Sequence, residues 1–249
     1  MIPGRHVRKD KGDRKSGERG EKFDFFNGCL YIRESRTCVA SDLHMGLEDE
    51  LRRQGLAFPL NEEKILSERL EMALERFKPS TFILDGDIFH SFDRADKAVR
   101  DKFSSLMSVL EERCDVVLVR GSHDTMLPKL YPKALDRFDA KGFTFAHGHD
   151  PIEDHGALIM GHEHPVLEID MDRLPCFLLG EKMITGSDLV VLPAFNPLCQ
   201  GVAINFMNGR DFMSPLLKKL DAGELSPVVE YQGEVLAFPK LRGLRAHIV

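Results

Sequence analysis

The chain has 249 residues, of which 43% are hydrophobic and 30% charged, and its formal net charge is −6. These values are ordinary for a globular protein with one large core or two small ones. No apolar run approaches the roughly 20 residues that a membrane-spanning helix needs, and the hydrophilic N-terminus is unlike a secretory signal. We therefore expect a cytoplasmic protein with no membrane segment.

The first 22 residues differ in charge from the rest. They hold eight Lys or Arg against four Asp or Glu, a net of +4, whereas the remaining residues hold 26 against 36, a net of −10. A basic segment with few apolar residues cannot offset its ordering entropy by burial, so we expect a mobile tail over residues 1–22. It is either simply solvated or a contact for a polyanion such as nucleic acid. Residues 23–249 are predicted to form a single domain.

Five short apolar runs each stop at a cluster of Gly, Asp or His. Runs of this kind predict buried strands that deliver polar side chains at their ends. They occupy residues 37–44, 81–87, 116–124, 143–150 and 157–164.

Two helical patterns separate the first three runs. Asn61 is expected to cap a helix whose apolar residues repeat every three or four positions until Pro79, and a second helix places apolar residues on one face from Val99 to Leu110. Alternating strands and helices predict an α/β sheet, whose ligands lie beyond the carboxyl ends of the strands. After His164, shorter runs broken by Gly, Pro and Asn favour an antiparallel meander that completes a second sheet.

Histidines gather at these strand ends. A lone histidine is more often structural than a ligand, but joint placement favours a site. Asp42-Leu43-His44 and His162-Glu163-His164 each put two potential ligands on one side of an extended segment. Imidazoles and carboxylates suit Mn, Fe or Zn in a catalytic site. The seven histidines are His44, His90, His123, His147, His149, His162 and His164.

Asp87 supplies a carboxylate that can bridge two cations, because each of its oxygens can bind one. Two metals roughly 3.5–4 Å apart clamp a phosphate and activate water. The glycines that precede ligands, Gly86, Gly121 and Gly161, allow the backbone to approach the ions closely.

The five cysteines are odd in number, widely spaced and never form C-x-x-C. We expect them to be reduced core residues, without a disulfide framework or a thiolate zinc site. They are Cys29, Cys38, Cys114, Cys176 and Cys199.

Ser122, His123 and Asp124 are consecutive, which excludes a Ser-His-Asp triad. In such a triad each side chain bonds the next in a line, whereas neighbours on an extended segment point to alternating sides. A G-x-S-x-G elbow is also missing from the sequence. A serine hydrolase is therefore not predicted.

The polar clusters form an ordered set of motifs. D-x-H lies at 42–44, G-D-x-x-H at 86–90, G-S-H-D at 121–124, H-G-H at 147–149 and G-H-x-H at 161–164. This set resembles the calcineurin-like metallophosphoesterase superfamily. The strings SDLHMGLEDELRRQGLAFP and LPAFNPLCQG are similar to a subgroup described as helicase- or ligase-associated phosphoesterases and grouped with DNA repair.

The resemblance implies two facing mixed β-sheets flanked by helices, a four-layer α/β/β/α sandwich with two divalent metals at one rim. Mn is the expected metal, with Zn, Fe or Ni as alternatives. His123 would protonate the leaving oxygen and Asp124 would orient it. One metal would be held by Asp42, His44, Asp87 and His164, and the other by Asp87, His147, His162 and Ser122. His149 and His90 would support these ligands or face the substrate.

Two residues depart from the superfamily pattern. His90 stands where many members have Asp, although a histidine can still donate or accept a hydrogen bond there. Ser122 replaces the usual Asn, and a hydroxyl is a shorter and poorer ligand than an amide carbonyl. The second metal would then be held more weakly or through a water.

The resemblance predicts hydrolysis of phosphodiesters by a metal-bound water, and single-stranded or damaged DNA is one candidate substrate. A helicase or ligase would be the partner. The alternatives are a phosphomonoesterase or nucleotide phosphatase, and a module that binds nucleic acid or a partner protein without turnover. The acidic body argues against strong binding of duplex DNA, which relies on Lys and Arg.

Overall fold

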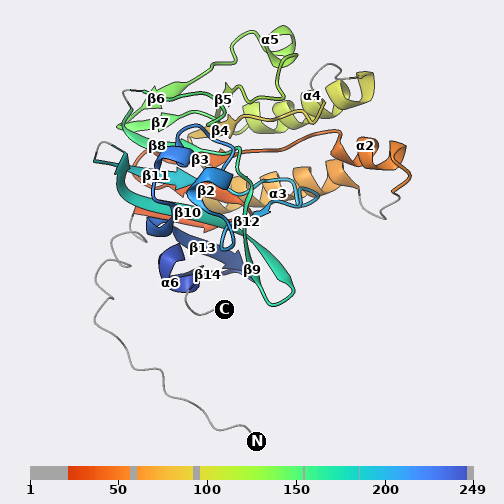
Figure 1. Cartoon of the computed structure of the whole chain (residues 1–249). Helices are drawn as coiled ribbons and strands as arrows, with labels where there is room; N and C mark the ends of the chain where they lie inside the picture. The colour runs from red at the N-terminus through yellow and green to blue at the C-terminus, as the bar shows by residue number, and fades with distance from the viewer. Residues whose placement is uncertain (1–21, 57–60, 92–95, 154, 185, 246–249) are drawn as a thin grey trace, which may run out of the picture.

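The structure, a computed structural model, describes residues 22–56, 61–91, 96–153, 155–184 and 186–245 (Figure 1). The predicted tail at 1–22 therefore lies outside the described residues, except for its last residue. None of the described helices combines the length and the apolar character that crossing a bilayer requires.

The first sheet has five strands in the order β1-β2-β3-β4-β5. β1, β2 and β3 pair antiparallel, and β3, β4 and β5 pair in parallel. The last three correspond to the first three predicted runs, whereas the β1–β2 hairpin was not predicted. The strands are β1 Phe23–Phe26, β2 Cys29–Ile32, β3 Thr37–Ala40, β4 Thr81–Asp85 and β5 Asp115–Val119.

Helices connect the parallel strands, as the sequence predicts. α3, Glu62–Phe77, begins where the side chain of Asn61 accepts a hydrogen bond from Lys64 N at 3.0 Å. α4, Lys97–Glu111, is capped by Asp96 and buries the predicted apolar face. Two shorter helices, α2 Leu47–Arg53 and α5 Leu127–Leu130, follow β3 and β5.

The second sheet has nine strands and is mixed. β7, β8 and β11 run parallel, and β10 pairs antiparallel with β9, β11 and β13. The expected meander is thus only partly correct, because β12 also pairs in parallel with β9. The strands are β6 Phe138–Ala140, β7 Phe143–Phe145, β8 Ala157–Met160, β9 Pro165–Ile169, β10 Asp172–Ile184, β11 Ser187–Val191, β12 Val202–Ala203, β13 Ser226–Tyr231 and β14 Glu234–Ala237.

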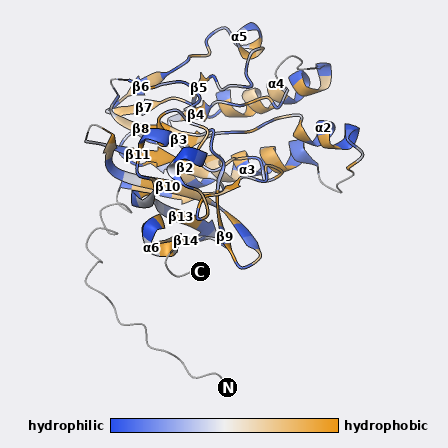
Figure 2. Ribbon diagram, viewed as in Figure 1, coloured by the Kyte–Doolittle hydropathy of each residue, from blue (hydrophilic) through white to orange (hydrophobic). Residues whose placement is uncertain are grey.

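Side chains that alternate along the strands build a four-layer molecule. Ile83 packs between the two sheets with Phe145 and Phe177, while its neighbour Phe82 packs beneath α3 and α4. In Figure 2 the central strands are coloured apolar. The predicted sandwich is confirmed, but the outer layer on the second sheet consists of short helices: η1 Gly209–Asp211, η2 Leu217–Lys219, η3 Ala222–Glu224 and α6 Leu241–Arg245.

Parallel pairing determines where the motifs lie. The chain leaves β3, β4 and β5 at one edge of the first sheet, and it leaves β7, β8 and β11 at the carboxyl ends of the second. An isolated parallel bridge between Ser41 and Ala194 joins the segments that follow β3 and β11. The polar clusters of both sheets therefore meet at a shared rim.

Candidate metal centre

Six of the predicted ligands come together at this rim. Asp42 Oδ1 lies 3.0 Å from His164 Nε2, Asp87 Oδ2 lies 3.2 Å from His147 Nε2, and His44 Nε2 lies 3.2 Å from His164 Nε2. Two triads have ligand atoms within 4.8 Å of one another: Asp42, His44 and Asp87, and Asp87, His147 and His162. Asp87 belongs to both, as a bridging carboxylate would.

The backbone is bent sharply at these positions. Five of the twelve described non-glycine residues with positive φ are predicted ligands. The left-handed region costs an L-residue about 1 kcal/mol. Residues with this strain are concentrated at functional sites, where the surrounding structure holds them in place. The five are Asp42 (φ 59°), His44 (42°), Asp87 (47°), His162 (72°) and His164 (45°).

Two glycines permit close approach to the carboxylates. A Cβ on Gly121 would lie 2.1 Å from Asp87 Oδ1, and one on Gly161 would lie 2.5 Å from Asp42 Oδ2. Real Cβ atoms never come so close, so any side chain here would displace a ligand. This explains why the G-S-H-D and G-H-x-H motifs each begin with glycine.

Hydrogen bonds fix one face of several ligands and leave another free. Asp42 Oδ2 accepts from Ser41 Oγ at 2.9 Å and from His162 N at 3.1 Å. His147 Nδ1 donates to the Asp85 carbonyl at 2.8 Å, which directs Nε2 into the centre. Among the described residues, Asp42 Oδ1 and His147 Nε2 are buried without a hydrogen-bond partner.

The pKa values of the histidines in the centre depend on burial and on the charges of their neighbours. Burial disfavours protonation of His147, but the carboxylates of Asp42 and Asp87 outweigh it and raise its pKa to about 10. Burial lowers the pKa of His44 to about 3, and burial together with the charge of His147 lowers the pKa of His162 to about 4. The pKa of His164 is also raised, because the charge of Asp42 outweighs burial, so the buried carboxylates favour protonation of His147 and His164 but not of His44 and His162.

A divalent cation fits this donor set. Asp42 is fully buried, and its Oδ1 makes no well-formed hydrogen bond although His164 Nε2 lies 3.0 Å away, so this carboxylate is costly unless a cation or a protonated imidazole faces it. The donors are imidazole nitrogens and carboxylate oxygens, the set expected for a catalytic metal. Glu163 lies between His162 and His164 in the sequence. Its carboxylate accepts hydrogen bonds from Met213 N and Ser214 N, so it binds the backbone of the outer layer and does not belong to the donor set.

The G-S-H-D residues occupy three different environments. Ser122 Oγ lies 3.2 Å from Asp87 Oδ2 and donates to that carboxylate. His123 Nδ1 donates to the His90 carbonyl at 2.6 Å, and its Nε2 lies 4.0 Å from Asp87 Oδ2. Asp124 was expected to orient His123, but its two oxygens accept from the backbone N–H groups of Gly121, Ile88 and Phe89. The structure thus puts a backbone carbonyl where that carboxylate was expected.

His90 and His149 border the centre. The His90 ring stacks on His123 with centroids 5.9 Å apart, and with His44 these two form a further group whose ligand atoms lie within 4.8 Å. The His149 ring lies 5.5 Å from that of His147. Both therefore lie where they can support ligands or face a substrate.

Two residues of the loop that follows β11 lie beside the centre and were not predicted from the sequence. Cys199 is half-buried, and its sulfur lies within 4.8 Å of ligand nitrogens of His44 and His164. The expectation that every cysteine belongs to the core is therefore wrong at this position. Asn196 is buried and donates to the Leu43 carbonyl at 2.9 Å. The string LPAFNPLCQG was the available signal, but no spacing rule connects it to the histidines.

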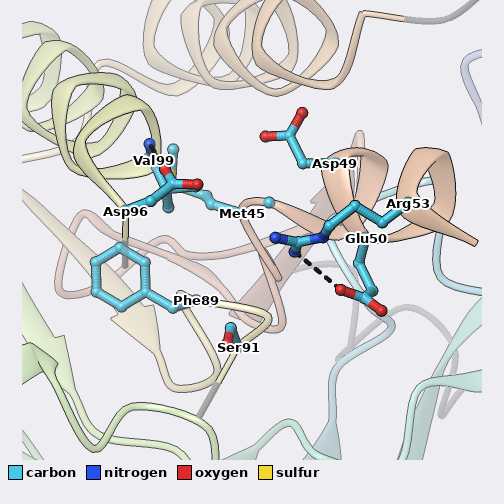
Figure 3. Close-up of a pocket in the computed structure, with 9 residues that line it drawn as sticks. Met45, Asp49, Glu50, Arg53, Phe89, Ser91, Asp96 and Val99 are labelled. Carbon is cyan, nitrogen blue, oxygen red and sulfur yellow. Dashed lines mark hydrogen bonds and ion pairs between the residues drawn. The ribbon is translucent and has the colours of Figure 1, made fainter. Parts of the chain in front are cut away.

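Two cavities flank α2 next to the centre. One, of about 600 Å³, includes His44, His123 and His164 in its wall. The other, of about 530 Å³, lies between α2 and the start of α4 and is shown in Figure 3, where Arg53 is paired with Glu50 at 2.8 Å. Asp49 and Asp96 also line this second cavity, which makes it acidic.

A family model described as calcineurin-like phosphoesterase matches residues 35–182, which is more than half of the chain. The chain belongs to the calcineurin-like phosphoesterase family. It is thus a metal-dependent phosphoesterase, as the motifs predict, and this membership favours turnover over a purely binding role. The helicase- or ligase-associated subgroup stays a prediction.

Two solved structures are similar to this chain, and the first of them supports the calcineurin-like architecture. The nuclease MPE of Pseudomonas putida superposes with a TM-score of 0.61 at 20% identity, covering 87% of this chain and 94% of that one. A predicted phosphoesterase from Streptococcus pneumoniae TIGR4 gives a TM-score of 0.31 at 13% identity, covering 81% and 95%. Among curated proteins, no sequence matches this chain.

Proposed function

We propose that this phosphoesterase hydrolyses phosphodiesters at a two-metal centre, with the ligand sets predicted from the sequence. The observation that carries the proposal is the position of Asp87, which lies within ligand distance of two separate groups of side chains. A carboxylate shared in this way is what a bridging ligand requires. Ser122 is kept as a proposed ligand of the second metal, because its hydroxyl lies beside Asp87.

The residues have distinct roles in this proposal. Bound metals would neutralise the phosphate and activate water for attack on phosphorus. His123 presents Nε2 to the centre, because its Nδ1 is committed to the His90 carbonyl, and it protonates the leaving oxygen. The backbone N–H of His123 donates to Asp87 Oδ1 at 2.8 Å and so couples the proton donor to the bridging carboxylate. Mn suits the nitrogen and oxygen donors.

Single-stranded DNA is the proposed substrate, with a role in DNA repair. The Pseudomonas putida protein of the same fold is a nuclease, which supports this choice by analogy. Residues 23–249 carry a net charge of −10, which disfavours extended contact with duplex phosphates. A helicase or ligase partner is proposed only on the subgroup resemblance.

The test uses full-length protein stripped of metal and then supplied with Mn, Zn or Mg. We expect Mn to give the fastest hydrolysis of bis(p-nitrophenyl) phosphate and of a labelled single-stranded oligonucleotide. Asp87→Asn should lower kcat by at least about 100-fold, whereas Asp172→Asn, an exposed carboxylate in the β9–β10 hairpin, should not. p-Nitrophenyl phosphate is assayed beside the diesters as the monoester. Cleavage of this monoester alone would make the protein a phosphomonoesterase, and cleavage of no ester would contradict the proposal.

A further inference from the structure

The 600 Å³ cavity beside the metal centre is a groove with an unusual wall. Four histidines and four leucines line it, together with a proline, a cysteine and a glutamine. A volume of this size matches a small-molecule site. The groove is lined by His44, Leu47, Leu51, Leu56, His90, His123, His164, Pro197, Leu198, Cys199 and Gln200.

The apolar side of α2 faces this groove without covering from the described residues. Leu47 and Leu51 lie one helical turn apart and are only half-buried, and Leu56 is 48% exposed. The polar residues of the same helix have partners elsewhere: Glu48 pairs with Arg52, and Asp49 with Lys102. Apolar surface concentrated beside a polar site is typical of a wall that contacts a ligand.

The groove also contains the proposed proton donor of the reaction. His123, the proposed proton donor, is part of its lining. A donor must lie within hydrogen-bond reach of the oxygen that it protonates, so the group attached to that oxygen extends from His123. The organic part of the substrate that leaves phosphorus therefore enters the groove.

We propose that the groove binds the leaving group of the phosphodiester through a flat ring that this group carries, such as an unpaired nucleobase or an aryl group. The proposal rests on the proposed function. The described residues of the groove lining include neither Lys nor Arg, so these residues offer no positive charge with which to hold further phosphates. The neighbouring cavity in Figure 3 is lined by Asp49, Glu50 and Asp96, whose carboxylates repel a phosphate ester.

Competitive inhibition of the Mn-loaded, full-length protein tests this assignment. Methylphosphonate and benzylphosphonate share the group that contacts metal and differ in the ring. We expect benzylphosphonate to bind roughly tenfold more tightly, since burial of a ring of this size is worth at least that factor. Thymidine 5′-phosphate and 2-deoxyribose 5-phosphate form the second pair, in which the ring is a nucleobase.

Substitutions in the groove should reduce the advantage of the ring. Leu56→Asn and Leu51→Asn each introduce a polar group into the wall, and we expect the ratio within each pair to fall to about threefold or less. Leu236→Asn is the matched control, because Leu236 on β14 is 41% exposed and lies outside the groove. It should leave both ratios unchanged.

The outcomes separate the two proposals. A preference only for thymidine 5′-phosphate that the groove variants abolish identifies a nucleobase, and a preference in both pairs identifies a general site for rings. Equal binding within both pairs, or a preference that the Leu51 and Leu56 variants retain, would overturn the groove assignment while Mn-dependent hydrolysis continues. Absence of Mn-dependent hydrolysis in the unaltered protein would overturn the proposed function, and the assignment with it.

Discussion

His123 is held on three sides by its neighbours. Its Nδ1 donates to the His90 carbonyl at 2.6 Å, its ring meets the edge of His44 with centroids 5.0 Å apart, and it stacks on His90. Because Nδ1 carries a proton in this bond, Nε2 is the atom available to the centre. A fixed ring that directs Nε2 toward the centre is what a proton donor requires.

His123→Asn should therefore lower kcat by about 10²–10⁴-fold for diesters with alkyl leaving groups. The loss should be much smaller for bis(p-nitrophenyl) phosphate, because p-nitrophenolate leaves without a proton. Metal content, measured by mass spectrometry after gel filtration, should stay at the level of the unaltered protein. His155→Asn is the control, since His155 Nδ1 also bonds a carbonyl but lies outside the centre. A loss of metal in the His123 variant would instead make His123 a ligand.

The sequence predicted most of the residues that come together at the centre, but not all of the contacts that hold them there. Asp42, His44 and Asp87 were identified because ligand type and spacing are encoded in short motifs. The role of Asp124 was not, since three backbone N–H groups compete for its carboxylate and no side-chain pattern reports them. Cys199 reaches the centre from 155 positions beyond His44, a separation that only the folded chain removes.

The loop after β11 ties the second sheet to the D-x-H segment. Phe195 N donates to the Ser41 carbonyl at 2.8 Å, and Asn196 N donates to the Asp42 carbonyl at 3.3 Å. The Asn196 amide also donates to Glu62 Oε1 at 2.9 Å, which brings the first turn of α3 into the same network. Three elements therefore position the turn that contains the first ligands.

Asn196→Asp places a second carboxylate beside Glu62. Burial already raises the pKa of Glu62. Repulsion should raise the pKa of the pair in the folded state above the ordinary carboxyl value. The folded state then holds its proton more tightly, so stability is lost progressively as the pH rises above about 4.5. We expect the deficit in the free energy of unfolding, measured by urea denaturation, to be about 3 kcal/mol larger at pH 8 than at pH 5.

Asn196→Ala is the control for this element. It removes the amide bond to Glu62, which helps to lower the pKa of that carboxyl, but it adds no charge. Its deficit in the free energy of unfolding should therefore change less between the two pH values than that of Asn196→Asp. If the two deficits change equally with pH, Glu62 is not close enough to interact with the new carboxylate.

Helices whose sequence signals lie within the helical segment were predicted, whereas a hairpin and a pairing between distant strands were not. α3 was predicted from a capping residue and a helical period, and α4 from its helical period alone, and these signals lie within each segment. The β1–β2 hairpin was not predicted, although Asn27 and Gly28 form its turn with positive φ. The parallel pairing of β11 with β8 was also missed, because partners so far apart in sequence leave no periodic trace.

At the scale of the whole molecule, the candidate centre joins the two halves of the sandwich. Asp42, His44 and Asp87 follow strands of the first sheet, whereas the H-G-H and G-H-x-H segments follow β7 and β8 of the second. Without a cation, the buried carboxylates and the protonated His147 must be accommodated by the apolar contacts between the sheets. Metal binding would relieve this cost and hold the sheets together.

Mn should therefore raise the thermal stability of the protein. At a free concentration 1,000-fold above Kd, one site contributes about 4 kcal/mol to the folded state. A chain of this length gains roughly 2–4 °C in Tm per kcal/mol, so calorimetry should show a rise of about 8–16 °C over metal-stripped protein. Asp87→Asn, which removes the shared carboxylate, should lose most of this rise, whereas Asp172→Asn should keep it. An equal rise in Asp87→Asn would mean that Mn stabilises the protein at some other place.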